Sequence, residues 1–305
     1  MYSMYKYDYI IAGAGLSGLL LAMELSKTSL KNKKVLLIDK DSKNSNDRTW
    51  CFWNDDFFEY DSIVFKKWNN IRYTTTTSNG KYNVAPYKYE YIRGLDFYNY
   101  VNEQLTKLGN FTRIIGEIIE ISPTGFVVVE GRKYEATLIF NSIHPAFPEF
   151  KYPSNCYYLL QHFKGYFIET EEDFFETDCA TFMDFSIEQH KEARFGYILP
   201  FSKREALVEY TLFSQNILKK EEYETELQNY ISNKLGIKKY KILHEEFGIV
   251  PMSTYSYQPK FEGKIIRIGT YGGFVKPSSG FAFSRTIKRI LLLHLVQDQV
   301  ILILE

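Results

Sequence analysis

The chain of 305 residues contains little cysteine, no excess of charge of either sign and no long hydrophobic run. Its three cysteines are far apart and odd in number, which excludes a disulfide framework and the ligand spacing of a zinc site. Lys plus Arg and Asp plus Glu both total 37, so the basic surface that binds a nucleic acid is missing. We therefore expect no metal, no nucleic-acid partner and a reducing, cytoplasmic location.

We also expect no segment that would anchor the chain in a membrane or export it. The apolar stretches Ile290–Val296 and Val300–Leu304 are each too short to span a bilayer. Residues 1–7 are polar and rich in Tyr, unlike a secretory signal. We expect at most a peripheral contact with the inner face of the membrane. Aromatic residues, in contrast, make up 17% of the chain, and their wide apolar surfaces suit a flat, apolar ligand.

A glycine-rich turn joins a short apolar strand to a helix near the start of the chain. Its sequence, Asp8-Tyr-Ile-Ile-Ala-Gly-Ala-Gly-Leu-Ser-Gly18, is followed by helical spacing over Leu16–Lys27 and by a second strand, Val35–Asp39. Asp39 ends that strand, where its carboxylate can accept the protons of ribose hydroxyls. The turn has the glycine spacing that permits a tight bend, close approach of a pyrophosphate and close helix packing: Gly13, Gly15 and Gly18. We interpret the segment as a dinucleotide site rather than a purely structural turn.

A second glycine-rich turn follows a strand-like segment, Ile266–Ile268, far down the chain. A nicotinamide dehydrogenase usually completes its cofactor site within one N-terminal domain, whereas FAD sites of the hydroxylase type return to the cofactor with a late turn of this kind. The sequence therefore predicts FAD. The expected cofactor contacts in Gly269-Thr-Tyr-Gly-Gly-Phe-Val-Lys-Pro-Ser-Ser-Gly280 are Gly269, Thr270, Gly272, Gly273, Pro277 and Gly280.

The remaining pattern divides the chain into two interleaved parts. Helical spacing over Gly94–Leu108 and three strand-like segments over residues 111–141 are typical of the helix and meander of an FAD domain. Antiparallel strands predominate over residues 157–251, where a charged helix interrupts them at about Lys219–Leu235. The predicted fold is α/β, with a Rossmann-like FAD-binding domain of the hydroxylase type and an inserted antiparallel-sheet substrate domain. We assign residues 1–60, 91–150 and 260–305 to the first domain, and residues 61–90 and 151–259 to the second.

Two carboxylates, Glu209 and Asp184, stand among apolar residues of the predicted substrate domain. By strand alternation Glu209 shares a face with Thr211 and opposes Tyr210. An acid in a dry pocket keeps its proton and can donate it to a weak base. The residues alone leave two interpretations open for each carboxylate. Glu209 is a solvent-facing glutamate or a buried acid, and Asp184 is a buried acid or a cap or partner of an arginine such as Arg194.

Seven sequence blocks recur in the same order as in a known protein family. They are Asp47-Arg-Thr-Trp-Cys-Phe-Trp53, Gln161–Gly165, Met183–Phe185, Tyr197–Ser202, Ala206–Thr211, Gly248–Met252 and Gly269–Gly280. With these blocks the chain resembles the lycopene beta-cyclases of bacterial carotenoid pathways, up to about Arg289. Family members continue for some tens of residues beyond the helix that starts near Ser284. The segment Gln299–Glu305 is therefore interpreted as a truncated or frame-shifted C-terminus.

The resemblance implies an isomerase, an intramolecular lyase, that closes the ends of lycopene into the rings of beta-carotene without net oxidation. An acid protonates the terminal double bond at C2, the C5=C6 bond attacks the cation at C1, and a proton leaves C6. In the family the glutamate at the position of Glu209 is taken as the acid/base residue, and the Met-Asp-Phe match makes Asp184 a support or a second acid. The resemblance also implies reduced FAD, as a negative charge beside the cation, and NAD(P)H as its reductant.

Arg48 follows the second strand, where arginines often lie near the adenosine or pyrophosphate of FAD. The alternative is a surface arginine paired with Asp47 or Asp55. Thr270 stands where related FAD enzymes commonly carry an aspartate that contacts the ribityl chain. His144 and His162 are interpreted as structural histidines. Two other functions stay open: another FAD-dependent isoprenoid reductase or monooxygenase of the same fold, which would consume NAD(P)H, and a non-catalytic flavoprotein.

Overall fold

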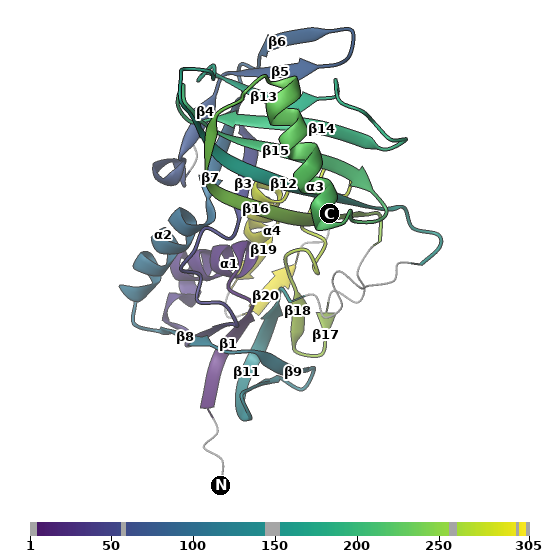
Figure 1. Cartoon of the computed structure of the whole chain (residues 1–305). Helices are drawn as coiled ribbons and strands as arrows, with labels where there is room; N and C mark the ends of the chain where they lie inside the picture. Colours follow the sequence, from purple (N-terminus) through teal and green to yellow (C-terminus); the bar gives the residue numbers. More distant parts are fainter. Residues whose placement is uncertain (1–4, 56–58, 144–152, 256–260, 297–298, 303–305) are drawn as a thin grey trace.

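The computed structural model describes residues 5–55, 59–143, 153–255, 261–296 and 299–302. A mostly parallel sheet lies below a mostly antiparallel sheet, in which only β13 and β5 pair in parallel among the described strands, and a small three-stranded sheet joins the two (Figure 1). Among the described residues no helix combines the length and the apolar character needed to cross a bilayer. His144 lies outside the described residues.

The lower sheet has eight strands, and its centre is parallel. The order β17-β18-β11-β1-β2-β8 is extended by β10, which pairs with β11 and β9. The second half of β1 and the first four residues of β2 are apolar and buried because both of their faces are covered there. The bounds are β1 Tyr5–Ala12, β2 Val35–Asp39, β8 Phe111–Ile115, β9 Ile118–Ser122, β10 Phe126–Val129, β11 Arg132–Asn141, β17 Phe261–Glu262 and β18 Ile265–Arg267.

Helices cover one face of this sheet and the meander β9–β10–β11 covers the other. Tyr9, Ile11 and Leu37 pack against the helices, whereas Ile10 and Leu36 pack against the meander. The helical segments of this part are α1 Leu16–Lys27, η1 Ser29–Asn32, η2 Asp61–Ile63, α2 Gly94–Thr106 and α4 Phe283–Leu291. A hairpin of β19, Leu293–Val296, and β20, Gln299–Leu302, follows α4.

The upper sheet has seven strands in the order β16-β12-β15-β14-β13-β5-β6. Its strands are β5 Asn70–Thr74, β6 Asn79–Asn83, β12 Tyr158–Thr170, β13 Cys179–Asp184, β14 Ala193–Pro200, β15 Glu205–Ser214 and β16 Tyr240–Ser253. One face packs against α3, Lys220–Asn229, and the π-helix η3, Tyr230–Lys234. The other face packs against the three-stranded sheet β3-β7-β4, whose bounds are Thr49–Asn54, Lys88–Arg93 and Lys66–Trp68.

The local predictions of helices and strands are confirmed in most places, with two differences. Helix Leu16–Lys27 and strand Val35–Asp39 form with the predicted bounds. The three strand-like segments expected over residues 111–141 are four strands, because Gly116 ends β8 and the chain turns into the meander. The charged helix expected at about Lys219–Leu235 is two segments, α3 and the π-helix η3. In the antiparallel region, β12 has thirteen residues that pair with both β15 and β16. The lower sheet draws its strands from residues 5–39, 111–141 and 261–267, and the upper sheet from residues 70–83 and 158–253.

Candidate functional site: a dinucleotide cavity and a buried carboxyl pair

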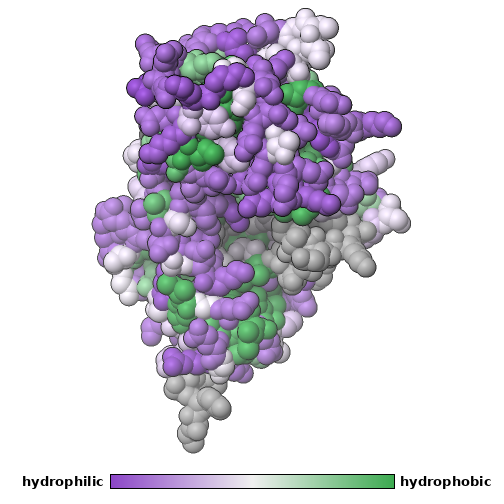
Figure 2. Space-filling view, in the orientation of Figure 1, coloured by the Kyte–Doolittle hydropathy of each residue, from purple (hydrophilic) through white to green (hydrophobic). Residues whose placement is uncertain are grey.

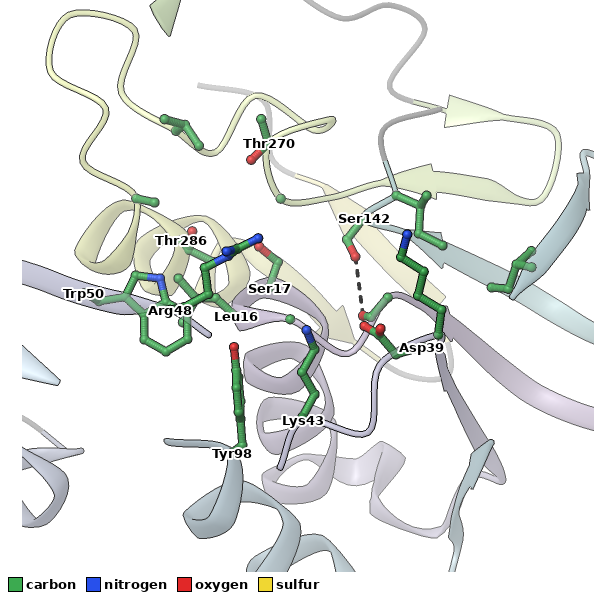
Figure 3. A pocket seen from close by; sticks show the side chains of 18 of the residues that line it. Leu16, Ser17, Asp39, Lys43, Arg48, Trp50, Tyr98, Ser142, Thr270 and Thr286 are labelled. Atoms are coloured by element: carbon green, nitrogen blue, oxygen red, sulfur yellow. Dashed lines mark hydrogen bonds between the residues drawn. The ribbon is translucent and has the colours of Figure 1, made fainter. Parts of the chain in front are cut away.

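A cavity of about 510 Å³ lies at the glycine-rich turn between β1 and α1. Its walls come from the ends of β1, β2 and β11, the start of α1, the late turn and α4. Figure 3 shows Asp39, Lys43, Arg48, Trp50 and Tyr98 arranged around the first turn of α1. The lining residues include three cations and two acids, so the cavity has a net positive charge: Lys40, Lys43 and Arg48 against Asp39 and Glu117.

The N-terminus of α1 offers this cavity unpaired backbone N–H groups. The helix begins after Gly15, has no acidic residue in its first turn, and receives no side-chain cap. The helix dipole therefore favours an anion there. A Cβ atom at Gly15 would meet no atom within 4 Å, so a side chain at this position would occupy the cavity. Gly18 has the close-packing role, because a Cβ there would lie 2.0 Å from the carbonyl oxygen of Gly13.

Asp39 lines the cavity, and its carboxylate accepts two backbone hydrogen bonds. Oδ2 accepts from the N–H of Ala14 at 2.7 Å and Oδ1 accepts from the N–H of Asp41 at 2.9 Å. These bonds hold the carboxylate against the glycine turn. Each carboxylate oxygen has a further lone pair, so the group can still accept a hydroxyl proton from a bound nucleotide.

Arg48 also lines the cavity, and the carboxylate of Asp47 does not take its charge. The guanidinium donates to the backbone oxygen of Asp47 at 2.9 Å. The Asp47 carboxylate instead binds Lys43 Nζ at 3.2 Å and the hydroxyl of Tyr98 at 2.8 Å. The Arg48 guanidinium therefore keeps donors for an anionic ligand, and its contact with a cofactor stays a prediction.

The late turn contributes to the cavity only in part. Gly269 and Thr270 line it, together with Val275 and Ala282, which sequence reasoning did not select. Gly280 has φ +69° and packs against β12 and β16, since a Cβ there would lie 2.7 Å from Gln161 Oε1. The remaining selected residues, Gly272, Gly273 and Pro277, are not among those that line the cavity, and like Gly280 they stay predictions as cofactor contacts.

Glu209 lies in the upper sheet beside a second glutamate that sequence reasoning missed. Gly165 of β12 is in register with Glu209 of β15 on one side and with Glu246 of β16 on the other. Residues in register across a sheet share a face, and Gly165 has no side chain to separate the two carboxyls. A Cβ at Gly165 would lie 2.9 Å from Glu209 Cγ and 3.1 Å from Glu246 Cγ.

In this Glu209–Glu246 pair Glu209 is buried, and Glu246 is half-buried with its Oε1 out of water. Glu209 is only 6% exposed, and its Oε2 accepts from the Thr211 hydroxyl at 3.1 Å. Burial, together with the negative charge of Glu246, raises the pKa of Glu209 well above its ordinary value. Burial raises the pKa of Glu246 as well, while the hydrogen bond from the Thr49 hydroxyl opposes the rise. The strand face predicted for Glu209 is confirmed, and that face is buried.

Asp184 is also buried, but on the opposite face of the sheet. It is in register with Gly196, which in turn is in register with Tyr210 rather than with Glu209. Its Oδ2 accepts from the Tyr230 hydroxyl at 2.9 Å and its Oδ1 accepts from the N–H of Ser186 at 2.9 Å. The structure therefore does not bring Asp184 and Glu209 together, and these contacts are those of a structural carboxylate.

The arginine suggested as partner of Asp184 lies elsewhere. Arg194 binds Glu192 at 2.6 Å and the hydroxyl of Tyr210 at 3.0 Å. His162 is fully buried between Ser214 and Tyr223. Three of the sequence blocks contribute residues to the carboxyl pair and its contacts, those that contain Thr49, Gly165 and Glu209, but none of them contains Glu246.

Comparison with known proteins gives the fold and the family. The structure aligns with a geranylgeranyl bacteriochlorophyll reductase-like protein of Thermoplasma acidophilum at a TM-score of 0.71 and 15% identity, over 95% of this chain and 77% of that one. It aligns with a flavin-dependent brominase at 0.61 and 14%, over 94% and 77%. The fold is therefore the hydroxylase-type α/β fold that the sequence predicted.

Curated relatives are carotenoid enzymes of plants. The chain is 26% identical to the neoxanthin synthase of Solanum lycopersicum over 92% of its own length and 58% of the relative's, and 26% identical to the capsanthin/capsorubin synthase of Capsicum annuum over the same shares. It is 24% identical to the lycopene beta cyclase of an Oncidium hybrid cultivar, over 92% and 61%. The chain thus spans about three fifths of the length of these relatives. Residues 8–293 match the family described as lycopene cyclase protein, which confirms the resemblance seen in the seven blocks. The chain therefore belongs to the lycopene cyclase family.

Proposed function

We propose that this chain is a flavin-dependent lycopene beta-cyclase that converts the ends of lycopene into the rings of beta-carotene by redox-neutral acid/base chemistry. The observation that carries the proposal is the buried Glu209, whose raised pKa keeps a proton available near neutral pH. An alkene is a very weak base, so a carboxylic acid must meet it in a site that excludes water. Family membership names the substrate class, and Glu209 supplies the chemistry.

The cavity at α1 fits FAD. Its glycine turn leaves room at Gly15, its helix N-terminus favours the pyrophosphate, and Arg48 and Asp39 suit the phosphate and the ribose. When bound and reduced, the flavin would supply a fixed negative charge that stabilises a carbocation on the substrate. We propose NAD(P)H as the source of the reducing electrons. It need not have a permanent binding site on the chain.

The residues of the upper sheet act on the proton. Glu209 would donate it to C2 of the terminal double bond, the C5=C6 bond would attack the resulting cation at C1, and a carboxylate of the pair would accept the proton that leaves C6. Tyr89, Tyr91 and Tyr197 surround the pair with aromatic surface, and burial raises the pKa of each hydroxyl above its ordinary value. They therefore stay neutral and shield the cation from water.

Lycopene is insoluble in water, so the chain has to meet it at a membrane. We propose a cytoplasmic protein that touches the membrane surface without spanning it. Figure 2 shows a hollow in the surface between the upper and lower parts of the molecule. A long apolar polyene could approach the two sheets along this hollow.

The decisive experiment is expression of the chain in cells that accumulate lycopene, followed by pigment analysis. Beta-carotene has the mass of lycopene, because ring closure only rearranges bonds. A reductase of the same fold would instead give products that are heavier by pairs of hydrogen atoms. With the purified protein, dithionite-reduced FAD alone should support product formation, and NAD(P)H oxidation should not track it. Stoichiometric consumption of NAD(P)H, or unchanged lycopene with FAD bound, would contradict the proposal.

A further inference from the structure

Glu209 and Glu246 lie on strands that do not pair with each other. Each strand pairs with β12, so the two carboxyls face each other across the width of one strand. This geometry exists only because Gly165 occupies the position between them. The sheet thus holds two acids together on one buried face.

One oxygen of the pair has no donor. Oε2 of Glu246 accepts from the hydroxyl of Thr49 at 3.2 Å, whereas Oε1 is buried and accepts no hydrogen bond. In the described part of the chain no lysine or arginine forms an ion pair with either glutamate. Two adjacent carboxylates without a cation repel each other strongly at low dielectric. A single proton on the pair would remove this repulsion and give Oε1 a donor.

Four groups that face the pair from neighbouring elements cannot supply that charge compensation. They are Cys51 of β3, Tyr89 and Tyr91 of β7, and Tyr197 of β14. On β16 itself a charge on His244 lowers the pKa of Glu246, and it is outweighed by burial, the largest cause, which raises that pKa. Burial raises the pKa of the Cys51 thiol to about 12, and the pKa values of the three phenols are raised too. These four groups are neutral near pH 7, and His244 is exposed beside Phe167.

We propose that Glu246 is the positioning residue of the acid, and that Glu209 and Glu246 share one proton above Gly165. The role in turnover rests on the cyclase function proposed above, whereas the shared proton does not. When Glu209 gives its proton to C2, a C–H bond forms and the pair becomes a dianion. Repulsion makes that dianion a strong base, so it takes the proton released when the C6–H bond breaks. The pair ends each ring closure with the one proton it had at the start, and no outside acid or base is consumed.

The shared proton can be tested without turnover. In infrared spectra of the purified protein between pH 5 and pH 10, the carbonyl band of a buried protonated carboxyl should be present at pH 7 and disappear in Glu209→Gln. In Glu246→Gln, which keeps the size and hydrogen-bonding groups of the side chain but removes the charge, the pKa read from that band should fall by one unit or more. Glu246→Asp keeps a charge in the pair and should retain most of the elevation.

Glu245→Gln is the matched control. Glu245 is the adjacent residue on β16, is half exposed and binds Lys164, so its removal should leave the band unchanged. An unchanged pKa in Glu246→Gln, or an equal shift in Glu245→Gln, would overturn the proposal. The proposal would also be overturned if Glu209→Gln showed the same carbonyl band at pH 7 as the wild-type protein. This comparison does not depend on whether the Glu246 variants fold.

The role in turnover has a separate readout. The alkaline limb of the pH–rate profile for cyclisation should move to lower pH by one unit or more in Glu246→Gln and stay in place in Glu245→Gln. If the infrared result holds while no variant or wild type cyclises lycopene, the shared proton stands and the cyclase proposal falls. If wild type cyclises lycopene and Glu246→Gln leaves the profile in place, the positioning role of Glu246 is overturned and the cyclase proposal stands.

Discussion

Thr49 and Trp50, consecutive residues of β3, face opposite sides of that strand. Trp50 lines the dinucleotide cavity and packs against Phe97 and Phe283, whereas the hydroxyl of Thr49 donates to Glu246 at 3.2 Å. The cavity and the carboxyl pair are therefore separated by one strand. Adjacent side chains on a strand alternate in direction, so this separation is fixed by the backbone.

The first prediction concerns the acid. Glu209→Gln preserves the volume and the hydrogen bond to Thr211 but removes the transferable proton. Beta-carotene formation should fall by about a hundredfold or more, the share that general acid catalysis contributes, while FAD content is retained. Asp184→Asn should cost less, because Asp184 is bound by Tyr230 and Ser186 on the other face. Pigment analysis and flavin absorbance measure both effects, and a Glu209→Gln protein with parental pigment would move the proton donor elsewhere.

A second prediction follows from the raised pKa of Glu209. The folded state binds a proton there more tightly than the unfolded chain, so its stability declines as the pH rises from about 4.3, the ordinary glutamate pKa, toward the folded pKa. Glu209→Gln removes this loss. At pH 8 the variant should melt about 2 °C or more above the parent, and at pH 4 the two should melt together. Differential scanning fluorimetry at both pH values checks this. If Glu209→Gln were less stable than the parent at pH 8, the contacts of the charged Glu209 carboxylate would fully offset the cost of its burial, and the prediction would be wrong.

The third prediction concerns Gly15. A Cβ at this position meets no protein atom within 4 Å, so Gly15→Val should fold normally and place its side chain inside the cavity. We expect at least a tenfold loss of FAD affinity with little change in melting temperature. Gly131→Val is the control, because Gly131 is also unobstructed but lies away from the cavity. Since Gly131 has φ +75°, that control should lose stability and keep its affinity. Equal FAD content in Gly15→Val and the parent would contradict the assigned pyrophosphate position.

The fourth prediction concerns His162, whose ring is buried between Tyr223 and Ser214. Ser214 donates to the carbonyl of Asn216 at 2.5 Å, so Nε2 carries the ring proton and Nδ1 accepts from Tyr223. Burial lowers the pKa of His162 to about 4. The unfolded chain then binds a proton that the folded chain does not, and stability is lost as the pH falls from about 6.5 toward 4. His162→Gln should show a smaller loss of urea midpoint over this range. An identical loss in parent and variant would assign it to other groups.

The dinucleotide-binding half of the molecule could be predicted from the sequence because its motifs are local. The turn at Gly13–Gly18, the helix that follows and the strand that ends at Asp39 lie within 35 consecutive residues, and each forms as expected. The spacing of the glycines fixes the backbone, and the backbone creates the cavity. The contribution of Val275 and Ala282 was not readable, because it depends on how the late turn folds back over α1.

Only one residue of the carboxyl pair, Glu209, could be predicted from the sequence, because the pair depends on the register between strands that are distant in the sequence. Alternation placed Glu209 on one of two faces but did not say which face is covered. Glu246 meets Gly165 across 81 positions of sequence, and no local pattern fixes the pairing of β16 on β12. A slip of one residue would have turned Glu245 inward instead. For the same reason Asp184, whose neighbours in sequence are as apolar as those of Glu209, could not be assigned to the opposite face.

Gly165 makes one backbone position the spacer between two acids. It lies on the central strand, and the glutamates 44 and 81 positions later, on the two strands that flank it, come together across it. A methyl group here would lie 2.9 Å from Cγ of Glu209 and 3.1 Å from Cγ of Glu246, so one change of that glycine to alanine would push the acids apart.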